Sequence, residues 1–309
     1  MLMNRFVLRQ SALLLLAATI WGVAFVAQSV GMEYVGPFTF LASRSVIGTF
    51  VLIPYILLRE RKKVEIQREY VTDVKGLICG GVCCGCLLFV ASILQQIGIV
   101  YTTVGKSGFI TAMYIVIVPI ISIFLKKKAG IKVWLGVVLA VAGLYFLCMA
   151  SGNISLQKGD VLTFLCAVTF SFHILTVDYF APRIDGVKLS CIQFATCGLL
   201  SGIGMFLFET PTMEAVLAAW LPILYAGALS SGVAYTLQIV GQRGMNPTVA
   251  SLLMSMESVI SVIAGWAILN QALSGRELLG CVLMFAAIIL VQLPDKMSDA
   301  ELKKQKNIE

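Results

Sequence analysis

The sequence has little charge for its length. Charged residues make up 13% of its 309 residues, whereas about 25% is usual in soluble globular chains. Hydrophobic residues reach 59%, against about 45–50% in soluble chains. This composition excludes an ordinary soluble domain and indicates an integral membrane protein. The net charge of +7 comes from basic clusters that flank apolar runs, as membrane topology requires, so we expect no nucleic-acid partner.

Histidine and the motifs of enzymes are scarce as well. The single histidine, His173, excludes multi-histidine metal or phosphatase sites, and neither G-x-S-x-G nor H-E-x-x-H occurs. No nucleotide-binding motif is present, so ATP does not drive the protein directly. We therefore predict no catalytic residue, no metal and no cofactor, and an intramembrane enzyme is only a remote alternative.

The nine cysteines indicate neither disulfides nor a metal site. Their number is odd, and all of them lie inside or at the edge of apolar segments. The run Cys83–Cys86 has no second cysteine cluster and no histidine at ligand spacing. We expect these cysteines to act as small packing residues between helices.

Ten apolar runs are long enough to cross a bilayer, whose hydrocarbon core takes about 20 helical residues. They cover roughly 11–31, 37–58, 77–97, 104–125, 132–150, 160–180, 189–208, 218–240, 247–268 and 277–293. The first is interpreted as a retained helix, because its apolar run is long for a signal peptide and no clear A-x-A site follows. The expected fold is an all-α integral membrane protein with ten transmembrane helices.

Lysine and arginine are distributed unevenly between the two sides that these spans define. If the chain begins in the cytoplasm, nineteen fall on the cytoplasmic side, and only Lys106, Lys158 and Arg276 fall outside. Short cytoplasmic loops are enriched in these residues. We therefore expect a multi-pass protein of the plasma (inner) membrane with both termini in the cytoplasm.

Two stretches of the chain recur about 143 residues apart. "LQQIG" (Leu94–Gly98) ends the third span and "LQIVG" (Leu237–Gly241) ends the eighth, and residues 135–147 resemble residues 279–291. Each repeat holds five spans, and because five is odd the second copy enters the membrane from the opposite side. We expect two inverted five-helix repeats around a central cavity. Residues 1–150 form the first, and residues 151–309, with a short cytoplasmic C-terminal tail, form the second.

Four motifs connect the sequence with a known family. They are "IWG" (Ile20–Gly22), the arginine of "FLASRSVIG" (Arg44), residues 101–120 and "SMESVISVIAGW" (Ser255–Trp266). On these motifs the chain resembles the drug/metabolite transporter superfamily, in its ten-helix EamA-type branch, over residues 13–293. Where the family usually has a Glu-Pro pair, Ser258 follows Glu257 here. Because of this difference, the position of Glu257 and its counterpart in the first repeat need not have the same role.

The resemblance implies a basket of ten helices around a central cavity, with amino acids and related compounds as the commonest cargo. We predict a secondary transporter that exports a small polar metabolite of this kind by alternating access. Uptake of a nutrient such as a nucleoside, vitamin or amine is the alternative. The expected partners are a small-molecule substrate and the lipid bilayer, and we expect a monomer, with a dimer as the alternative.

Polar side chains form stripes on six of the spans, at spacings that place each stripe on one helix face. Hydrocarbon does not solvate such groups, so we expect the stripes to surround a wet cavity, although single Ser, Thr or Gln residues could instead bond between helices. The expected cavity residues are Trp21, Gln28, Gln95, Thr111, Tyr114, His173, Thr176, Tyr235, Gln238 and Glu257.

Four of the ionisable residues within or beside the spans leave alternatives open. Glu257 lies mid-span, where a charge costs roughly 2.5–3.5 kcal/mol or more. It could bind an amino group of the cargo, carry a coupling proton, or bond to another helix. His173 could relay protons or pack as a hydrogen-bonded core residue. Arg44 and Lys106 are expected to be gating or structural charges: Arg44 through an ion pair, helix-end bonds or cargo, and Lys106 by reaching the outer surface or capturing a carboxylate.

Overall fold

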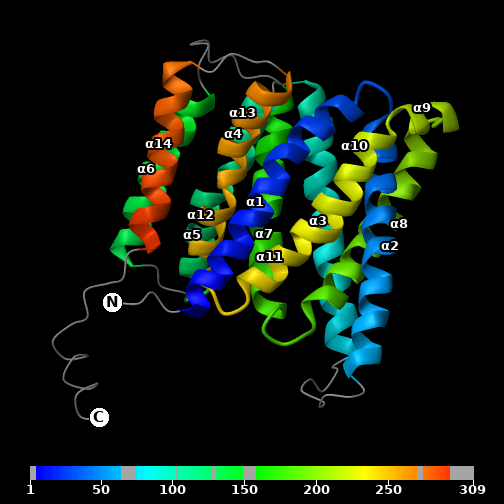
Figure 1. Ribbon diagram of the computed structural model, residues 1–309, viewed down its shortest axis with the longest axis horizontal. Coiled ribbons are helices and arrows are strands. Elements are labelled where there is room, and N and C mark those ends of the chain that lie inside the picture. The colour runs from blue at the N-terminus through cyan, green and yellow to red at the C-terminus, as the bar shows by residue number, and fades with distance from the viewer. Residues whose placement is uncertain are drawn as a thin grey trace.

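The computed structural model describes residues 5–63, 74–101, 104–126, 130–148, 158–269 and 274–292. The regular structure within these ranges is helical (Figure 1). The elements in chain order are α1 (Arg5–Gly31), α2 (Pro37–Lys63), α3 (Val74–Val100), α4 (Val104–Ala112), α5 (Tyr114–Phe124), α6 (Ile131–Cys148), α7 (Lys158–Phe180), α8 (Gly186–Phe208), α9 (Met213–Ala218), α10 (Trp220–Leu224), the π-helix η1 (Tyr225–Ala234), α11 (Tyr235–Gln242), α12 (Pro247–Met254), α13 (Met256–Leu269) and α14 (Gly275–Gln292).

Eight stretches of the described chain are long and apolar enough to cross a membrane, and α6 and α14 are shorter apolar helices. These ten crossings lie where the sequence predicts them, so the predicted all-α membrane fold is confirmed. Helix α1 begins and α14 ends at one face of the bundle, which we call the terminal face; it is the lower face in Figure 1.

Three of the crossings are interrupted, which the sequence did not predict. A break at Met113 separates α4 from α5, and a break at Ser255 separates α12 from α13. The eighth crossing runs through α10, η1 and α11, so its middle is wound as a π-helix. These interruptions place irregular backbone in the middle of the bundle, where membrane proteins tolerate it only if it is buried in protein or lines a cavity.

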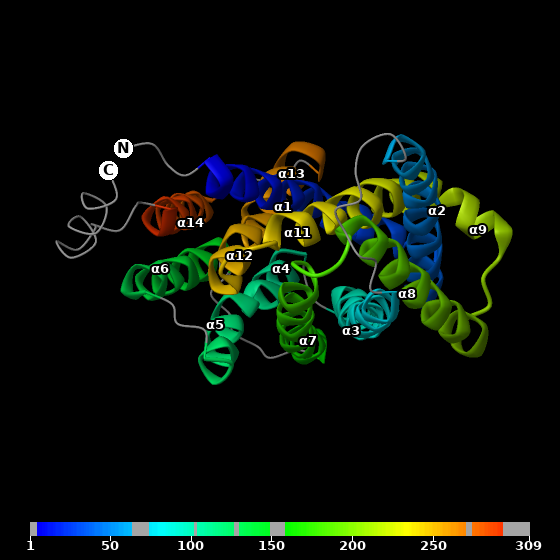
Figure 2. The ribbon, with the colours of Figure 1, turned by 90° about the horizontal axis from the view of Figure 1, so that it is seen from below.

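The crossings form an elongated bundle with paired helices at its ends. Helix α6 packs mainly against α14 at one end, and α2 packs mainly against α8 at the other (Figure 2). Helices α1, α4, α7, α11, α12 and α13 lie between these pairs (Figures 1 and 2). The middle of the bundle therefore consists of helices from both halves of the chain.

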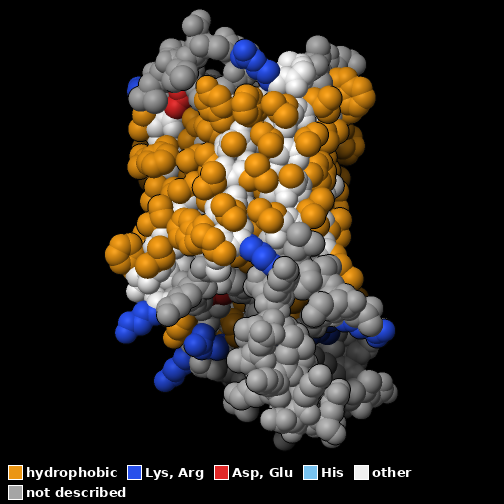
Figure 3. Space-filling view, turned by 90° about the vertical axis from the view of Figure 1, so that its left-hand side faces the viewer, with side chains coloured by type: hydrophobic (Ala, Val, Ile, Leu, Met, Phe, Trp, Pro, Cys, Tyr) orange, Lys and Arg blue, Asp and Glu red, His pale blue; other side chains and the backbone are white. Residues whose placement is uncertain are grey.

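The outside of the bundle carries a belt of hydrophobic side chains. Figure 3 shows this belt on the side of α6 and α14, with lysine and arginine side chains near its two ends. On these helices Val138 is 66% exposed and Ile289 is 61% exposed. Such a belt matches the hydrocarbon layer, whereas charged side chains belong at the water interfaces.

Two hydrogen bonds of the same kind occur in the two halves of the chain. Gln96 Nε2 of α3 donates to the carbonyl of Gln28 in α1 over 3.5 Å. In the second half, Gln242 Nε2 of α11 donates to the carbonyl of Ile174 in α7 over 3.4 Å. In both bonds the donor lies 68 residues after the acceptor. The third and eighth crossings thus hold the first and sixth in the same way.

Glycines bring helices of different halves into close contact. A Cβ on Gly81 would lie 2.4 Å from Ile192 of α8, and one on Gly85 would lie 2.5 Å from Thr196. Residues four apart share one helix face, so this face of α3 packs directly on α8. Small residues at such spacing let membrane helices approach closely, and here the approach is within one chain.

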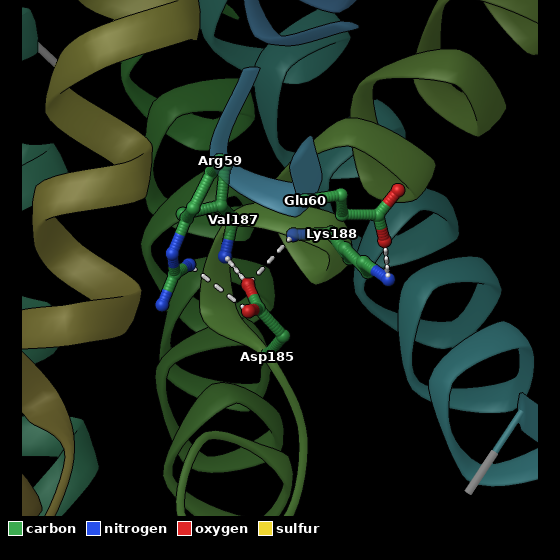
Figure 4. A network of polar contacts seen from close by, with 5 residues as sticks. All are labelled: Arg59, Glu60, Asp185, Val187 and Lys188. Atoms are coloured by element: carbon green, nitrogen blue, oxygen red, sulfur yellow. Dashed lines mark hydrogen bonds and ion pairs between the residues drawn. The ribbon is translucent and has the colours of Figure 1, made fainter. Parts of the chain in front are cut away.

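Polar contacts hold α2 against α8 at both ends. At the terminal face, Asp185 caps α8 by accepting from the backbone N–H groups of Val187 and Lys188, and it pairs with Arg59 of α2 over 3.0 Å. Figure 4 shows this network together with the neighbouring ion pair of Lys188 and Glu60. An acidic N-cap satisfies helix N–H groups that have no intrahelical partner.

The opposite end of the α2–α8 pair is held by a carboxylate as well. Glu209, directly after α8, accepts hydrogen bonds of 2.8 Å from the backbone N–H groups of Phe38 and Thr39 at the start of α2. It also accepts a 2.6 Å bond from the Thr39 hydroxyl. Each of these two helices therefore has a capped N-terminus that is tied to its neighbour.

Candidate functional site

A cavity lies between helices of both halves of the chain. The space between the atoms of its wall is about 490 Å³, which includes space open to solvent. Helices α1 to α5, α7, η1 and α11 to α13 contribute side chains to its wall. The lining residues are Trp21, Phe25, Gln28, Arg44, Gln95, Thr111, Tyr114, Phe170, Ile174, Ser230, Tyr235, Gln238, Met254 and Glu257.

Serine side chains account for the break that positions Glu257. The Ser255 hydroxyl donates to the carbonyl of Leu252 over 2.7 Å, and the Ser251 hydroxyl donates to that of Thr248 over 2.9 Å. Such bonds compete with the helix's own hydrogen bonds and bend it. A new helix, α13, starts at Met256, which places the Glu257 carboxylate in its first turn, where the helix dipole favours a negative charge.

A matching break in the first half positions the partner of Glu257. Tyr114 is the first residue of α5 and directly follows the break at Met113. Its hydroxyl donates a hydrogen bond of 2.8 Å to Glu257 Oε1. Nearby, the Ser258 hydroxyl donates to the carbonyl of Gly108 over 3.1 Å. The two broken crossings therefore meet at the cavity and are joined there by polar contacts between the halves.

Arg44 reaches the cavity through the contact between α2 and the π-helix. Its Nε donates to the Ser231 hydroxyl over 3.1 Å and its Nη2 donates to the Ser230 hydroxyl over 3.0 Å. Gly48 and Gly227 allow this approach, because a Cβ on Gly48 would lie 2.7 Å from Ser231 and one on Gly227 would lie 2.6 Å from the facing helix. Segments of π-helix are rare and often occur at functional sites.

The cavity holds two opposite charges that are not paired. Arg44 is 5% exposed and Glu257 is 7% exposed. Among the described residues, the polar partners of Arg44 are the two serines and that of Glu257 is Tyr114, so neither charge has an ion-pair partner there. Each charge is held by neutral hydroxyl groups, and both face the same cavity.

An aromatic cluster fixes one wall of the cavity. The Tyr235 ring lies 4.7 Å from Trp21 and 5.3 Å from Phe194 between centroids, in edge-to-face geometry. His173 lies behind Tyr235, with its ring centroid 6.1 Å away. Rings in this geometry stabilise one another beyond their buried area, so they support one another on the side of α1 and α11.

Comparison with protein families matches the chain twice, at residues 9–149 and again at residues 157–293, to the EamA-like transporter family. The chain belongs to the EamA-like transporter family. This is a family of transporters, so the protein is a multi-pass membrane transporter and not an enzyme. The two matches correspond to the repeated halves of the chain.

Relatives of this EamA-like transporter align over most of its length. It is 28% identical over 281 residues to an uncharacterized transporter of Archaeoglobus fulgidus, an alignment that covers 91% of this chain and 84% of the relative. It is 24% identical to the uncharacterized transporter YoaV of Bacillus subtilis, covering 88% of this chain and 92% of that one. A crystal structure with 19% identity superposes with a TM-score of 0.74, over 97% of this chain and 99% of the other. This last likeness shows the fold alone.

The structure of the EamA-like transporter brings together eight of the ten residues expected to line the cavity. They are Trp21, Gln28, Gln95, Thr111, Tyr114, Tyr235, Gln238 and Glu257. Arg44, expected to be a gating or structural charge, is a lining residue as well. The backbone of Lys106 belongs to α4, and its side chain lies outside the described part of the structure.

His173 and Thr176, also expected there, are not among the residues that line this cavity. His173 is fully buried between α7 and α8, where its Nε2 lies 3.1 Å from Gln193 Oε1. The Thr176 hydroxyl donates to the carbonyl of Phe172 on its own helix over 2.8 Å. The face of α7 that lines the cavity carries Phe170 and Ile174 instead, and His173 lies about 100° of helix rotation from Ile174.

Five lining residues were not expected from the sequence: Phe25, Phe170, Ile174, Ser230 and Met254. Four of them are apolar, and polar stripes cannot reveal apolar members of a cavity wall. Ser230 lies in η1, where its hydroxyl accepts the hydrogen bond from Arg44 Nη2. Within the described ranges, no group of three or more His, Cys, Asp or Glu residues is arranged to hold a metal ion.

Proposed function

We propose that this EamA-like transporter exports a small zwitterionic metabolite, an amino acid or a related compound, across the plasma membrane by alternating access. The observation that carries the proposal is the pair of opposite charges, Glu257 and Arg44, on the wall of one cavity. Neither has an ion-pair partner among the described residues. A zwitterion supplies both missing counter-charges in one molecule.

The cost of these charges supports a role in binding. An ionised side chain at mid-membrane costs about 2.5–3.5 kcal/mol on the lower estimates. A neutral amide or hydroxyl could form the observed bonds to Tyr114, Ser230 and Ser231 without that cost. An ammonium group at Glu257 and a carboxylate at Arg44 would form charge-assisted hydrogen bonds, which are roughly twice as strong as neutral ones. Arg44 also presents a planar fork that fits a carboxylate.

The location of the site supports alternating access. Tyr114 and Arg44 belong to the first half of the chain, whereas Glu257 and Ser230 belong to the second, and the bonds at the site join the two. We propose that residues 1–150 and 151–309 act as inverted halves that rock about this site. Cargo held between such halves is exposed first to one side of the membrane and then to the other.

The orientation in the membrane follows from basic residues. Their excess on one side supports a plasma (inner) membrane protein with both termini cytoplasmic, so the terminal face would meet the cytoplasm. Export then means that cargo enters the cavity from the terminal face. The close contacts of the glycines of α3 are made within the chain, and we propose that the protein acts as a monomer.

Flux through the purified protein tests this proposal. Proteoliposomes loaded with an unlabelled amino acid mixture should take up labelled serine by exchange, and the variant Glu257→Gln/Arg44→Gln should reduce that uptake to the level of empty liposomes. Efflux of preloaded serine from cells that express the protein tests the direction. Transport of amines that lack a carboxylate at an equal rate would favour the alternative of nutrient uptake, for which Glu257 alone suffices. A pH gradient applied across the same liposomes tests coupling to protons.

A further inference from the structure

Two glutamines occupy matching positions in the repeated sequence motif of the two halves but differ in their bonding. Gln95 in "LQQIG" corresponds to Gln238 in "LQIVG", and both line the cavity. Gln95 Nε2 donates to the Thr111 hydroxyl over 3.2 Å. Thr111 lies two residues before the break at Met113, and Leu253 lies two residues before the break at Ser255. If the two glutamines are aligned instead, Thr111 corresponds to Met254. Neither Leu253 nor Met254 has a hydroxyl, so the second repeat lacks the group that engages the glutamine of the first.

Among the described residues, the side-chain carbonyl oxygen of Gln238 also has no partner. Gln238 is 2% exposed, and its Oε1 is buried without a hydrogen bond among the described residues. A buried polar atom without a partner costs about 1–3 kcal/mol. Because Gln238 lines the cavity, a hydrogen-bond donor on a bound cargo would satisfy this acceptor.

An unpartnered donor lies on the same wall. The Trp21 Nε1 is buried without a hydrogen-bond partner among the described residues, and its ring packs edge-to-face on Tyr235 at 4.7 Å. Tyr235 lies three residues before Gln238 in α11, on the same face of that helix. Trp21 is also adjacent to Gly22, whose Cβ position lies 2.8 Å from the carbonyl oxygen of Glu257. The open donor and the open acceptor therefore belong to residues that line the same cavity as Glu257.

We infer that Trp21 and Gln238 form a third binding contact beside Glu257 and Arg44. This contact binds an uncharged polar group on the cargo. The group must accept from the Trp21 N–H and donate to the Gln238 carbonyl, as a hydroxyl or a carboxamide does. Because such a group both donates and accepts, it also fits a Gln238 amide turned by 180°. This inference rests on the proposed function: Glu257 and Arg44 hold the charged ends, while Trp21 and Gln238 select the side chain.

Pairs of amino acids that differ in one polar group test this selection. Threonine and valine have the same shape but differ by a hydroxyl, and asparagine and leucine differ by a carboxamide. In competition with labelled serine, threonine and asparagine should inhibit uptake by wild-type proteoliposomes at concentrations about tenfold or more below those of valine and leucine. The variants Gln238→Met and Trp21→Phe should each shrink that ratio toward one.

Gln95→Met is the matched variant for this test. The Gln95 amide is already bonded to Thr111, so its loss should leave the preference for threonine over valine in place, whatever it does to the absolute rate. Melting temperatures of the three variants show whether each is folded, and the wild-type comparison requires no variant at all.

The outcomes separate this inference from the proposed function. Equal inhibition by threonine and valine in the wild type would overturn the third binding contact while leaving zwitterion transport intact. A preference that survives in both Gln238→Met and Trp21→Phe would overturn it as well. If labelled serine is not transported and no amino acid binds, both the proposed function and this inference are wrong.

Discussion

The Tyr114 hydroxyl and the Glu257 carboxylate are joined across the two halves of the transporter by a hydrogen bond of 2.8 Å. Each residue lies within two positions of a break in its crossing, so the contact forms where both helices are interrupted. Glu257 thus has the bond to another helix that the sequence left as one of three alternatives. Tyr114 gives the carboxylate a neutral donor, and under the proposed function the ammonium group of the cargo supplies a charged one.

Glu257→Gln separates the charge of this residue from its bond to Tyr114. Glutamine keeps an acceptor for the hydroxyl but removes the negative charge. We expect serine exchange in proteoliposomes to fall at least about tenfold, because a hydrogen bond to a charged group contributes about 1.5–3 kcal/mol. The matched variant Tyr114→Phe removes the same bond and keeps the charge, so its loss should be smaller. Equal losses would assign Glu257 a structural role.

Arg44→Gln removes the proposed contact to the cargo carboxylate. The wild type should transport serine at least about tenfold faster than serinamide at low substrate concentration, because the amide lacks the charge that Arg44 binds. In Arg44→Gln this preference should disappear. Ser230→Ala/Ser231→Ala keeps the guanidinium and loosens only its support, so it should keep a preference for serine. A preference that persists in Arg44→Gln would contradict carboxylate binding there.

His173 is expected to matter for stability more than for transport. The structure removes it from the cavity wall and pairs it with Gln193 at 3.1 Å, behind Tyr235. His173→Ala should lower the free energy of unfolding by about 1–3 kcal/mol, because Gln193 then loses its buried partner. Thermal unfolding in detergent measures this. His173→Ala/Gln193→Leu should lose less than the sum of the two single variants, since the partners act together. A severe loss of transport in folded His173→Ala protein would restore a functional role.

The crossings and most polar wall residues could be predicted because both follow from solvation. Hydrocarbon requires long apolar helices, which predicts the ten spans. It does not solvate polar groups, which predicts that residues such as Gln238 face the cavity. The sequence indicates less directly which face of a densely packed helix turns toward the cavity. The sixth crossing buries polar residues on several sides, and His173 turned toward α8 while Phe170 and Ile174 faced the cavity.

The interruptions and the bonds of Arg44 could not be predicted for a different reason. The breaks at Met113 and Ser255 carry neither proline nor glycine, so the sequence has no strong signal for them. The expected ion pair or helix-end bonds of Arg44 are replaced by Ser230 and Ser231, which lie 186 and 187 residues away. Contacts at such separation depend on the packing of α2 against the π-helix, which sequence periodicity does not report.

Asp185 is predicted to stabilise the α2–α8 pair through two separable contacts. Its side chain caps α8 and pairs with Arg59, which is partly exposed. Asp185→Asn keeps a good cap and loses the ion pair, so it should lower the free energy of unfolding by less than about 1 kcal/mol. Asp185→Ala loses both and should cost about 1–2 kcal/mol, the upper part of that range reflecting the lost cap. Melting temperatures of the two variants measure the difference. Equal melting temperatures would mean that the cap contributes nothing.

Competition binding to the purified wild-type protein in nanodiscs tests the pairing of Glu257 and Arg44 most directly. Labelled serine would be displaced by unlabelled serine, by serinamide, which keeps only the positive charge, and by 3-hydroxypropanoate, which keeps only the negative one. We predict that serine displaces the label at concentrations at least about tenfold below either single-charge compound, because only serine satisfies both charges. Displacement by serinamide or 3-hydroxypropanoate as effective as that by serine would contradict a zwitterion site between the two halves.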